Sequence, residues 1–440
     1  MITADPTIGD LTTTVNALWL LVAAALVLIM TPGVAFFYGG MVKARSVVSM
    51  MMMSFGAMGL VGVLWVIYGY GLAFGTVAGN TSNDLIPGVL GNPSGQFLLG
   101  DLVGAPDGSG ANLYGLAFAG FQATFAIITV ALISGAIADR AKFGSWMLFA
   151  FLWVTIVYFP VAHWVFNFTA DPTTGAATDG GWIVFNMGVN DFAGGTAVHI
   201  NAGAAGLALA LVLGKRIGFQ KGIQKPHNVP LTLLGAALLW FGWFGFNAGS
   251  AAAVNGTAAI AWINTLAAPA AAILGWLIVE KFKDGKPTSI GAASGAVAGL
   301  VAITPACNIL TPGWGMVLGA VTGAICCLAI ELKFKLGFDD SLDVVGIHLV
   351  GGIIGTLYIG IFGTGIGLID RIGNGDSNPL SQLGAQAVGA GSVLVFSFVI
   401  AWLLGTAIQK TIGFRISTED EVAGVDTVVH GEESYVLDPA

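Results

Sequence analysis

Two histidines of the chain stand in nearly the same sequence setting. Asp191 precedes His199 by eight residues, and Asp340 precedes His348 by eight residues. Small residues follow both histidines, namely Ala202, Gly203 and Gly206 after the first and Gly351, Gly352 and Gly355 after the second. A neutral imidazole carries one hydrogen-bond donor and one acceptor, and it exchanges a proton near neutral pH. Two such rings in contact could share a proton and offer both functions to a small polar molecule.

The segments that carry these histidines are too apolar for a water-soluble domain. Hydrophobic residues make up 56% of the chain and charged residues 9%, whereas about a quarter of a soluble domain is charged. The 65 glycines stand among Ala, Leu, Val and Ile, which excludes a flexible low-complexity chain. Glycines spaced four apart favour close helix contacts in lipid. These are Gly245 with Gly249, Gly295 with Gly299, Gly351 with Gly355, and the run Gly315, Gly319 and Gly323.

Eleven segments of the chain are apolar enough to cross a membrane, since about 20 residues span a hydrocarbon core of about 30 Å. They run from Asn16 to Tyr38, Val47 to Phe74, Leu113 to Ile137, Trp146 to Phe168, Phe192 to Leu213, Val229 to Ala252, Ala258 to Ile278, Ile290 to Thr304, Trp314 to Ile330, Leu342 to Phe362 and Leu383 to Ile408. Met1 to Asn16 contains no Lys or Arg. It therefore lacks the basic region of a secretory signal peptide, and the first segment is expected to remain in the mature protein.

Basic residues orient these segments. Fifteen of the sixteen Lys and Arg follow odd-numbered segments, and only Arg371 falls on the other side. Because basic residues accumulate in cytoplasmic loops, we expect the amino terminus outside and the carboxyl terminus in the cytoplasm. The long polar loops Thr76–Asn112 and Thr169–Asp191 then lie outside as surface caps.

The segments fall into two similar halves. The repeated Asp–His spacing, and a looser echo of Phe36–Gly40 in Phe246–Ser250, indicate a five-helix unit used twice, over residues 16–213 and 229–363, before an eleventh helix over 383–408. An odd number of helices inverts the second copy, as is common in transporters. At about 1.5 Å per residue, His199 lies about 12 Å below the outer face and His348 about 12 Å above the inner face. In a core of about 30 Å, about 6 Å of depth then separates the two rings.

Membrane depth changes how these side chains are interpreted. Ionisable groups inside a bilayer are rare and usually line a pathway, so a functional role for the two histidines is favoured over simple packing. Asp191 and Asp340 can cap the free amides of their helices, and they can also attract a cation. His163, near the outer end of the fourth segment, fits a packing role and a functional role equally well.

Several functions are excluded by what the sequence lacks. The net charge of −8 comes largely from the ends and loops, and no basic patch indicates nucleic-acid binding. Cys307, Cys326 and Cys327 lack zinc-site spacing and suggest no disulfide framework, so we expect no metal and no cofactor. No nucleophile with its base and no phosphate-binding loop points to an enzyme. Residues 413–440 form an acidic tail that is too short for a catalytic domain, after a transmembrane part over residues 1–412.

Long ordered stretches resemble the Amt/Mep/Rh ammonium transporter family, of the bacterial Amt type, over nearly the whole chain. They are Asp191–Leu207, Asp340–Gly352, Gly242–Ser250, Gly120–Arg140 and Lys225–Asn228. The resemblance implies a multi-pass protein of the cell membrane that transports ammonium, with methylammonium as an analogue. It also implies a homotrimer with one pore per subunit.

Carried over position by position, the resemblance makes His199 and His348 the twin histidines of the pore. Phe121 and Phe125 match two phenylalanines of the third helix. Phe125 then belongs to the outer recruitment site, and Phe246 is the gate stacked beneath it.

The resemblance also assigns three further residues to the outer site. Ser250 matches its hydroxyl, and Asp191 matches the aspartate that supports the site from behind. Phe166 stands where many bacterial members have Trp, which is the stronger cation–π partner. We therefore expect weaker affinity at this site, unless Trp164 or Phe168 compensates.

The tail Gly413–Tyr435 resembles the cytoplasmic end of the family, including Asp426 and the His430-Gly-Glu pattern. This similarity implies contacts with neighbouring subunits and with a cytoplasmic P-II signal protein. The expected mechanism deprotonates ammonium outside and passes ammonia between the histidines, and net proton co-transport is left open. Two alternatives also stay open: an ammonium sensor that acts through its tail, and a transporter or channel for another small solute.

Overall fold

The computed structural model describes residues 7–75, 80–105, 110–170, 177–220 and 225–435. Within these ranges, ten helical segments are long and apolar enough to cross a membrane, and Ser289–Ile303 is apolar but shorter. The ten are Ile8–Met41, Ala44–Phe74, Leu113–Ile137, Phe143–Phe166, Gly195–Leu213, Val229–Gly249, Gly256–Asp284, Pro312–Leu336, Val345–Phe362 and Ser381–Thr411. The predicted all-α membrane fold is confirmed. The count of eleven crossings and the side of each terminus stay predictions, and Lys221, which supported that orientation, lies outside the described residues.

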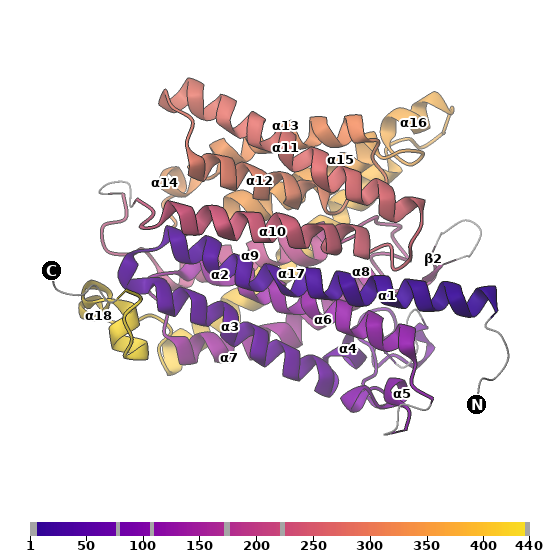
Figure 1. Ribbon diagram of the computed structural model, residues 1–440, viewed down its shortest axis with the longest axis horizontal. Helices are drawn as coiled ribbons and strands as arrows, with labels where there is room; N and C mark the ends of the chain where they lie inside the picture. The colour runs from indigo at the N-terminus through magenta and orange to yellow at the C-terminus, as the bar shows by residue number, and fades with distance from the viewer. Residues whose placement is uncertain (1–6, 76–79, 106–109, 171–176, 221–224, 436–440) are drawn as a thin grey trace.

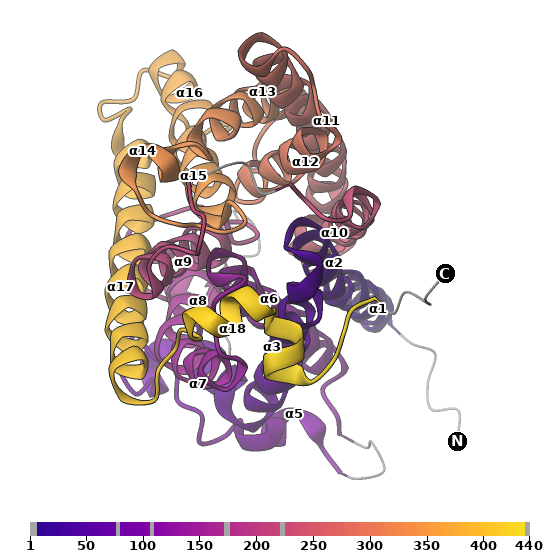
Figure 2. The same ribbon diagram turned by 90° about the vertical axis from the view of Figure 1, so that its left-hand side faces the viewer.

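The long helices lie side by side along the long axis of the molecule (Figure 1), and Figure 2 shows them end-on. α1 (Ile8–Leu28) begins at the end of the bundle opposite to α18 (Thr418–Ala423). The other α-helices are α2 (Met30–Met41), α3 (Val47–Leu64), α4 (Tyr70–Phe74), α5 (Gly100–Val103), α6 (Leu113–Ile133), α7 (Phe143–Trp153), α8 (Phe159–Phe166), α9 (Asn201–Leu213), α10 (Val229–Gly249), α11 (Gly256–Asp284), α12 (Ser289–Ile303), α13 (Pro312–Ala329), α14 (Leu332–Leu336), α15 (Val350–Phe362), α16 (Leu368–Gly373) and α17 (Ser381–Thr411).

Short helices of other types, labelled η, interrupt or extend the long ones. The 3-10 turns are η1 (Ala44–Ser46), η3 (Thr81–Asn83), η4 (Phe97–Leu99) and η5 (Ser134–Ile137). The π-helical turns are η2 (Trp65–Gly69), η6 (Val154–Tyr158), η7 (Gly195–Ile200), η8 (Val345–Leu349) and η9 (Asp426–His430). Both repeat histidines therefore lie on π turns, which are frequent at functional sites.

Helix ends differ from the prediction where polar residues cap them. The first helix begins at Ile8, and not at Asn16, because Thr7 and Asp10 form a capping box that stabilises additional turns beyond the apolar stretch. The fourth ends at Phe166, and Phe168 belongs instead to β1 (Phe168–Ala170), which pairs antiparallel with β2 (Ala177–Gly180). Apolar length alone could not show either feature.

Glycines bring the helices into contact, as the sequence predicted. A Cβ atom at Gly319 would lie 2.0 Å from the carbonyl oxygen of Ala268 on α11, and one at Gly355 would lie 2.1 Å from that of Ala302 on α12. At each of the other predicted positions the nearest atom would lie within 3.1 Å. Larger residues at these points would force the helices apart, so glycine sets the bundle's close packing.

The acidic tail is folded against the ends of α3 and α9, where Figure 2 shows α18 lying across the bundle. The Asp426 carboxylate accepts hydrogen bonds from the amides of Val48 and Ser49 at 3.0 and 2.8 Å. Glu421 accepts from the amide of Ile217 at 2.6 Å, just beyond α9. The tail therefore satisfies free amides at one helix start and in one loop.

Candidate functional site

The helix of His199 begins on a carboxylate, as the sequence predicted. Asp191 accepts from the amides of Gly194 and Gly195 at 3.0 and 2.6 Å. Its other oxygen accepts from Thr196 and Ala197 at 2.8 and 3.0 Å. Four backbone donors thus fix one side chain, and the positive end of the helix dipole favours its charge.

The helix of His348 begins in a similar but sparser way. The Asp340 carboxylate accepts from the amide of Val345 at 2.7 Å, and the Lys333 ammonium donates to the Asp340 carbonyl at 3.0 Å. Burial is the main reason why the pKa of Asp340 rises to about 6. The two aspartates are therefore both caps, but Asp191 is held by more donors.

The two histidines meet inside the bundle. Their Nδ1 atoms lie 3.2 Å apart, their ring centroids 5.3 Å apart, and their planes 16° from parallel. Both side chains are buried. The prediction that the two rings can hydrogen-bond to each other is thus confirmed.

A single hydrogen fits between the two Nδ1 atoms, and this fixes the chemistry of the neutral pair. One ring donates through Nδ1 and keeps a lone pair on Nε2, while the other accepts through Nδ1 and carries its hydrogen on Nε2. The pair therefore offers one acceptor and one donor away from their mutual contact. Nε2 of His199 has no hydrogen-bond partner in the described part of the chain.

A narrow, mostly apolar cavity adjoins the histidine pair. Its volume, about 10 Å³ for a water-sized sphere, is close to the minimum that holds one small molecule. The lining comes from α2, α6, α10, α12 and the two π turns, and consists of Met30, Val34, Phe37, Tyr38, Ile128, Leu132, Val198, His199, Leu239, Trp243, Phe246, Val297 and His348. Such a space would hold an uncharged small molecule more readily than a hydrated ion.

Trp243 is a cavity residue that sequence reasoning missed. Its ring stacks on His199 with centroids 5.4 Å apart and planes 18° from parallel. Its indole nitrogen donates to the Thr304 hydroxyl at 2.8 Å, which fixes the ring. The spacing of Trp243, Phe246 and Ser250 by three and then four residues places all three on one helix face, and this signal could have revealed it.

Three phenylalanines pack together beside the cavity, and one of them, Phe246, also lines it. Phe125 of α6 stacks on Phe246 of α10 with centroids 4.1 Å apart, and Phe246 lies 6.1 Å from the His199 ring. Phe121 meets Phe125 edge-on at 4.8 Å. The structure thus brings together all three phenylalanines that the resemblance selected.

The remaining outer-site residues lie beside this stack. Phe166 meets Phe125 edge-on at 6.1 Å. The Ser250 hydroxyl donates to the Phe246 carbonyl at 2.8 Å, so its oxygen remains able to accept from a cation. Phe166 is therefore in ring contact with Phe125, and the Ser250 hydroxyl lies one helical turn beyond Phe246, the other ring of the stack.

Trp164 and Phe168, the two residues that could compensate for the missing tryptophan, make no ring contact with Phe125 or Phe166 in the described part of the chain. Trp164 packs against Trp182 and Phe396 at 5.5 and 4.8 Å, and its indole nitrogen donates to the Val89 carbonyl. Phe168 is 43% exposed on the hairpin. Of the three residues, only Phe166 makes a ring contact with Phe125 in the described part of the chain.

His163 ties the loop that contains Asp84 to α8. Its Nε2 lies 3.0 Å from the Asp84 carboxylate, and its Nδ1 lies 2.9 Å from the Ala73 carbonyl. Since the carbonyl can only accept, Nδ1 carries a hydrogen. Both ring nitrogens are engaged, which supports the packing interpretation of this residue.

Comparison with known proteins relates this geometry to one family. The sequence matches the Ammonium Transporter Family over residues 18–435. It is 52% identical to an ammonium transporter of Mycobacterium tuberculosis, over 95% of this chain and 89% of the relative. It is 42% identical to an ammonium transporter of Bacillus subtilis, over 96% of this chain and 98% of the relative.

Solved structures share the same fold. A protein described as a sensor Amt protein superposes with a TM-score of 0.84 at 28% identity, and the match covers 96% of this chain and 100% of that one. Mep2 of Saccharomyces cerevisiae superposes with a TM-score of 0.77 at 34% identity, over 92% of this chain and 88% of that one.

Proposed function

The chain belongs to the ammonium transporter family, a family of membrane transporters and not of enzymes, and we propose that it moves ammonium across the cell membrane through the cavity beside His199 and His348. The observation that carries the proposal is the buried imidazole pair with Nδ1 atoms 3.2 Å apart. A hydrogen-bonding pair at the centre of an apolar bundle suits a small molecule that both donates and accepts.

Recruitment begins at the outer site. Ammonium is a small hydrated cation, and its entry into hydrocarbon without replacement of that water is very costly. The faces of Phe125 and Phe166 attract a cation, and the Ser250 oxygen accepts one N–H. The resemblance puts Asp191 behind this site, and its carboxylate accepts hydrogen bonds from four backbone amides.

The stacked pair Phe125 and Phe246 closes the way inward. An intact ammonium ion finds no charged side chain in the lining of the cavity beyond it. The ion therefore leaves a proton outside the stack, and ammonia continues when the rings move. Inside, ammonia accepts from one imidazole Nε2–H and donates to the lone pair of the other.

Two histidine variants test this function. His199→Ala and His348→Ala are expected to abolish ammonium-limited growth of a transporter-deficient cell, or to admit K⁺, while the protein remains inserted and oligomeric. Phe241→Ala, a change at a side chain of α10 that is 57% exposed and does not line the cavity, serves as the control. Wild-type ammonium flux and selectivity in both histidine variants would sink the proposal.

Net charge transfer is a separate question within this function. If the proton released outside follows by another route, an ammonium pulse produces a current across proteoliposomes. Such a current would show that the proton is co-transported, and the absence of any current would exclude co-transport. An excess of K⁺ should not compete for uptake, and competition would favour a transporter of another small solute.

Sensing is the second candidate, because one structural relative is described as a sensor Amt protein. In that case the tail would carry the signal and conduction would be poor. Growth rescue separates the two functions, since well-expressed protein that restores no growth would favour the sensor.

We also propose a homotrimer and a cytoplasmic P-II signal protein as partners, on the strength of the family's tail pattern. The folded tail supports the second point, because it presents an ordered surface at one end of the bundle. Mass measurement in lipid nanodiscs and P-II pull-down with purified protein test each partner directly.

A further inference from the structure

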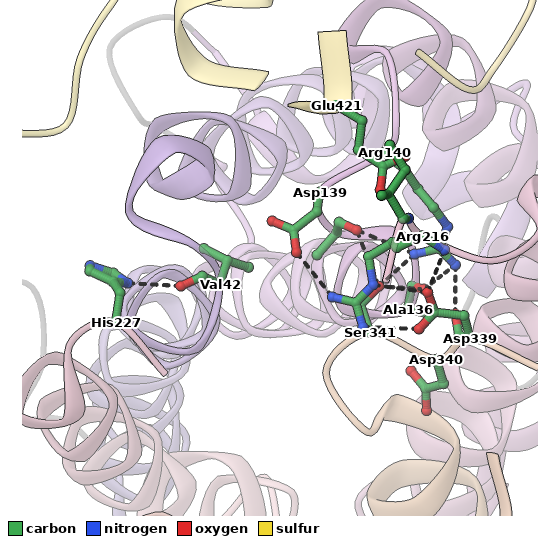
Figure 3. A network of polar contacts seen from close by, with 12 residues as sticks. Val42, Ala136, Asp139, Arg140, Arg216, His227, Asp339, Asp340, Ser341 and Glu421 are labelled. Atoms are coloured by element: carbon green, nitrogen blue, oxygen red, sulfur yellow. Dashed lines mark hydrogen bonds and ion pairs between the residues drawn. The ribbon is translucent and has the colours of Figure 1, made fainter. Parts of the chain in front are cut away.

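An ion pair joins the two helices that carry the histidines. Arg216 follows α9, the helix that continues from His199, and Asp339 stands nine residues before His348. The Asp339 carboxylate accepts from the Arg216 amide at 2.7 Å and from its guanidinium Nε and Nη2, both at 2.9 Å. Figure 3 shows both side chains within one polar network.

This pair is buried, and a buried ion pair is a poor source of stability. The Asp339 side chain is fully buried and that of Arg216 is 10% exposed. Removing two charges from water costs several kcal/mol, and a hydrophobic pair of similar size is often as stable. The planar guanidinium fork does, however, allow only a narrow range of carboxylate positions. The main effect of this pair is therefore to fix the position of Asp339 relative to Arg216.

Both partners stay charged at physiological pH. Burial alone would lower the pKa of Arg216, but its hydrogen bonds and charge contacts with Asp339 and Asp139 raise it. Burial alone would raise the pKa of Asp339, but the Arg216 contacts lower it below the usual range. Neither group therefore changes its protonation state across the physiological pH range, and the ion pair stays intact there.

A second arginine holds the same segment from the other side. Arg140 is fully buried beyond α6, and it donates to the Asp339 carbonyl at 2.6 Å and to the Ser341 hydroxyl at 2.5 Å. It also donates to the Ala136 carbonyl at 3.1 Å. Residues 339–341 thus have little freedom to slide relative to α6 and α9.

The far end of the His199 helix is fixed as well. Asp191 anchors η7 through four amides, so the helix is held by its cap outside and by Arg216 inside. The helix of His348 starts immediately after the segment that Arg216 and Arg140 hold. A hydrogen bond between two nitrogens weakens beyond about 3.2 Å, so a shift of the helices that lengthens the distance between the two Nδ1 atoms would weaken the histidine contact.

We propose that Arg216 and Asp339 are positioning residues that set the register of the two histidine helices and so control the selectivity of the pore. This inference rests on the proposed function of the histidine pair. Asp139 offers a matched control, because it also pairs with Arg216, at 3.0 Å, but belongs to the turn after α6 and not to either histidine helix.

The first test is a double-mutant cycle measured as the ratio of ammonium to K⁺ flux in proteoliposomes. Asp339→Asn should lower this ratio about tenfold or more, since displacements of about 1 Å can change rates by about a hundredfold. In a His199→Ala background the same change should have less than about a twofold effect, because the contact it positions is already lost. Asp139→Asn should leave the ratio near that of the wild type. An equal shift in both backgrounds, or none in either, would overturn the inference.

The second test does not depend on transport. Nitrogen-15 spectra of histidine-labelled protein in lipid should show the hydrogen-bonded imidazole pair in the wild type and in Asp139→Asn, but not in Asp339→Asn. If His199→Ala transports normally, the proposed function fails. The spectra of the wild type and Asp339→Asn still show whether Asp339 positions the two histidines. If Asp339→Asn does not insert, Arg216→Lys keeps the charge and loses the fork, and the same loss is expected. A pair signal unchanged in the inserted variant would show that the register is set elsewhere.

Discussion

Phe125 and Phe246 lie face to face, with ring centroids 4.1 Å apart and planes 16° from parallel. They come from α6 and α10, so the stack joins two helices from different halves of the chain. The contact is fully packed, since both rings are buried. On the proposed path from Ser250 to His199, a molecule must therefore displace at least one ring.

Removal of one ring of this stack should open the path to water. Phe246→Ala is expected to raise osmotic water permeability of proteoliposomes above that of the wild type, because no other side chain replaces the ring. It should also lower stability by about 3 kcal/mol, as is usual for a buried phenylalanine. Phe244→Ala is the control, since Phe244 stacks on Trp262 and does not line the cavity. Equal water permeability of the two variants would show that the stack is not the barrier.

The outer aromatic residue should limit affinity for the cation. Phe166→Trp is expected to lower the half-saturating ammonium concentration about two- to fivefold, since the stronger ring adds about 0.5–1 kcal/mol. Phe168→Trp introduces the same ring on the exposed hairpin and should change nothing. Uptake of labelled methylammonium at graded concentrations measures both. A similar gain at position 168 would contradict a specific role for Phe166.

Much of this arrangement could be predicted from spacing alone. The eight-residue interval between each aspartate and its histidine placed both imidazoles near one depth, and the structure confirms their contact at 3.2 Å. That prediction succeeded because helix rise and membrane thickness are nearly constant quantities. The close approaches at Gly319 and Gly355 were predictable for a similar reason, since only glycine lets two backbones touch.

Other features depend on contacts between distant segments and leave little local trace. The π turns at η7 and η8 do not alter apolar periodicity enough to be predicted. The Arg216–Asp339 pair joins residues 123 positions apart, and both residues fall between the predicted membrane segments. Trp243 was overlooked because an apolar aromatic in a membrane helix resembles any lipid-facing residue.

The two aspartate caps should differ in their contribution to stability. Each carboxylate oxygen of Asp191 accepts hydrogen bonds from two backbone amides. Asp191→Asn replaces one of these oxygens with an NH₂ group, which is a donor, and should lower the free energy of unfolding by at least about 2 kcal/mol. Asp340 has one carboxylate oxygen without a partner in the described part of the chain, so an amide group can take its place. Asp340→Asn should therefore cost less than about 1 kcal/mol. Thermal unfolding in detergent compares them, and equal losses would refute the difference.

The docked tail should come loose when Glu421 is removed. Its carboxylate accepts from the Ile217 amide at 2.6 Å and from the Arg415 guanidinium at 2.8 Å, so Glu421→Ala leaves both donors unpaired. Loss of about 2 kcal/mol of local stability should speed tryptic cleavage at Arg415 about tenfold or more. Glu419→Ala, an exposed change on the same short helix, should leave the rate unaltered. Cleavage in inside-out vesicles and not in right-side-out vesicles is expected for a cytoplasmic tail, and the reverse pattern would overturn the predicted orientation.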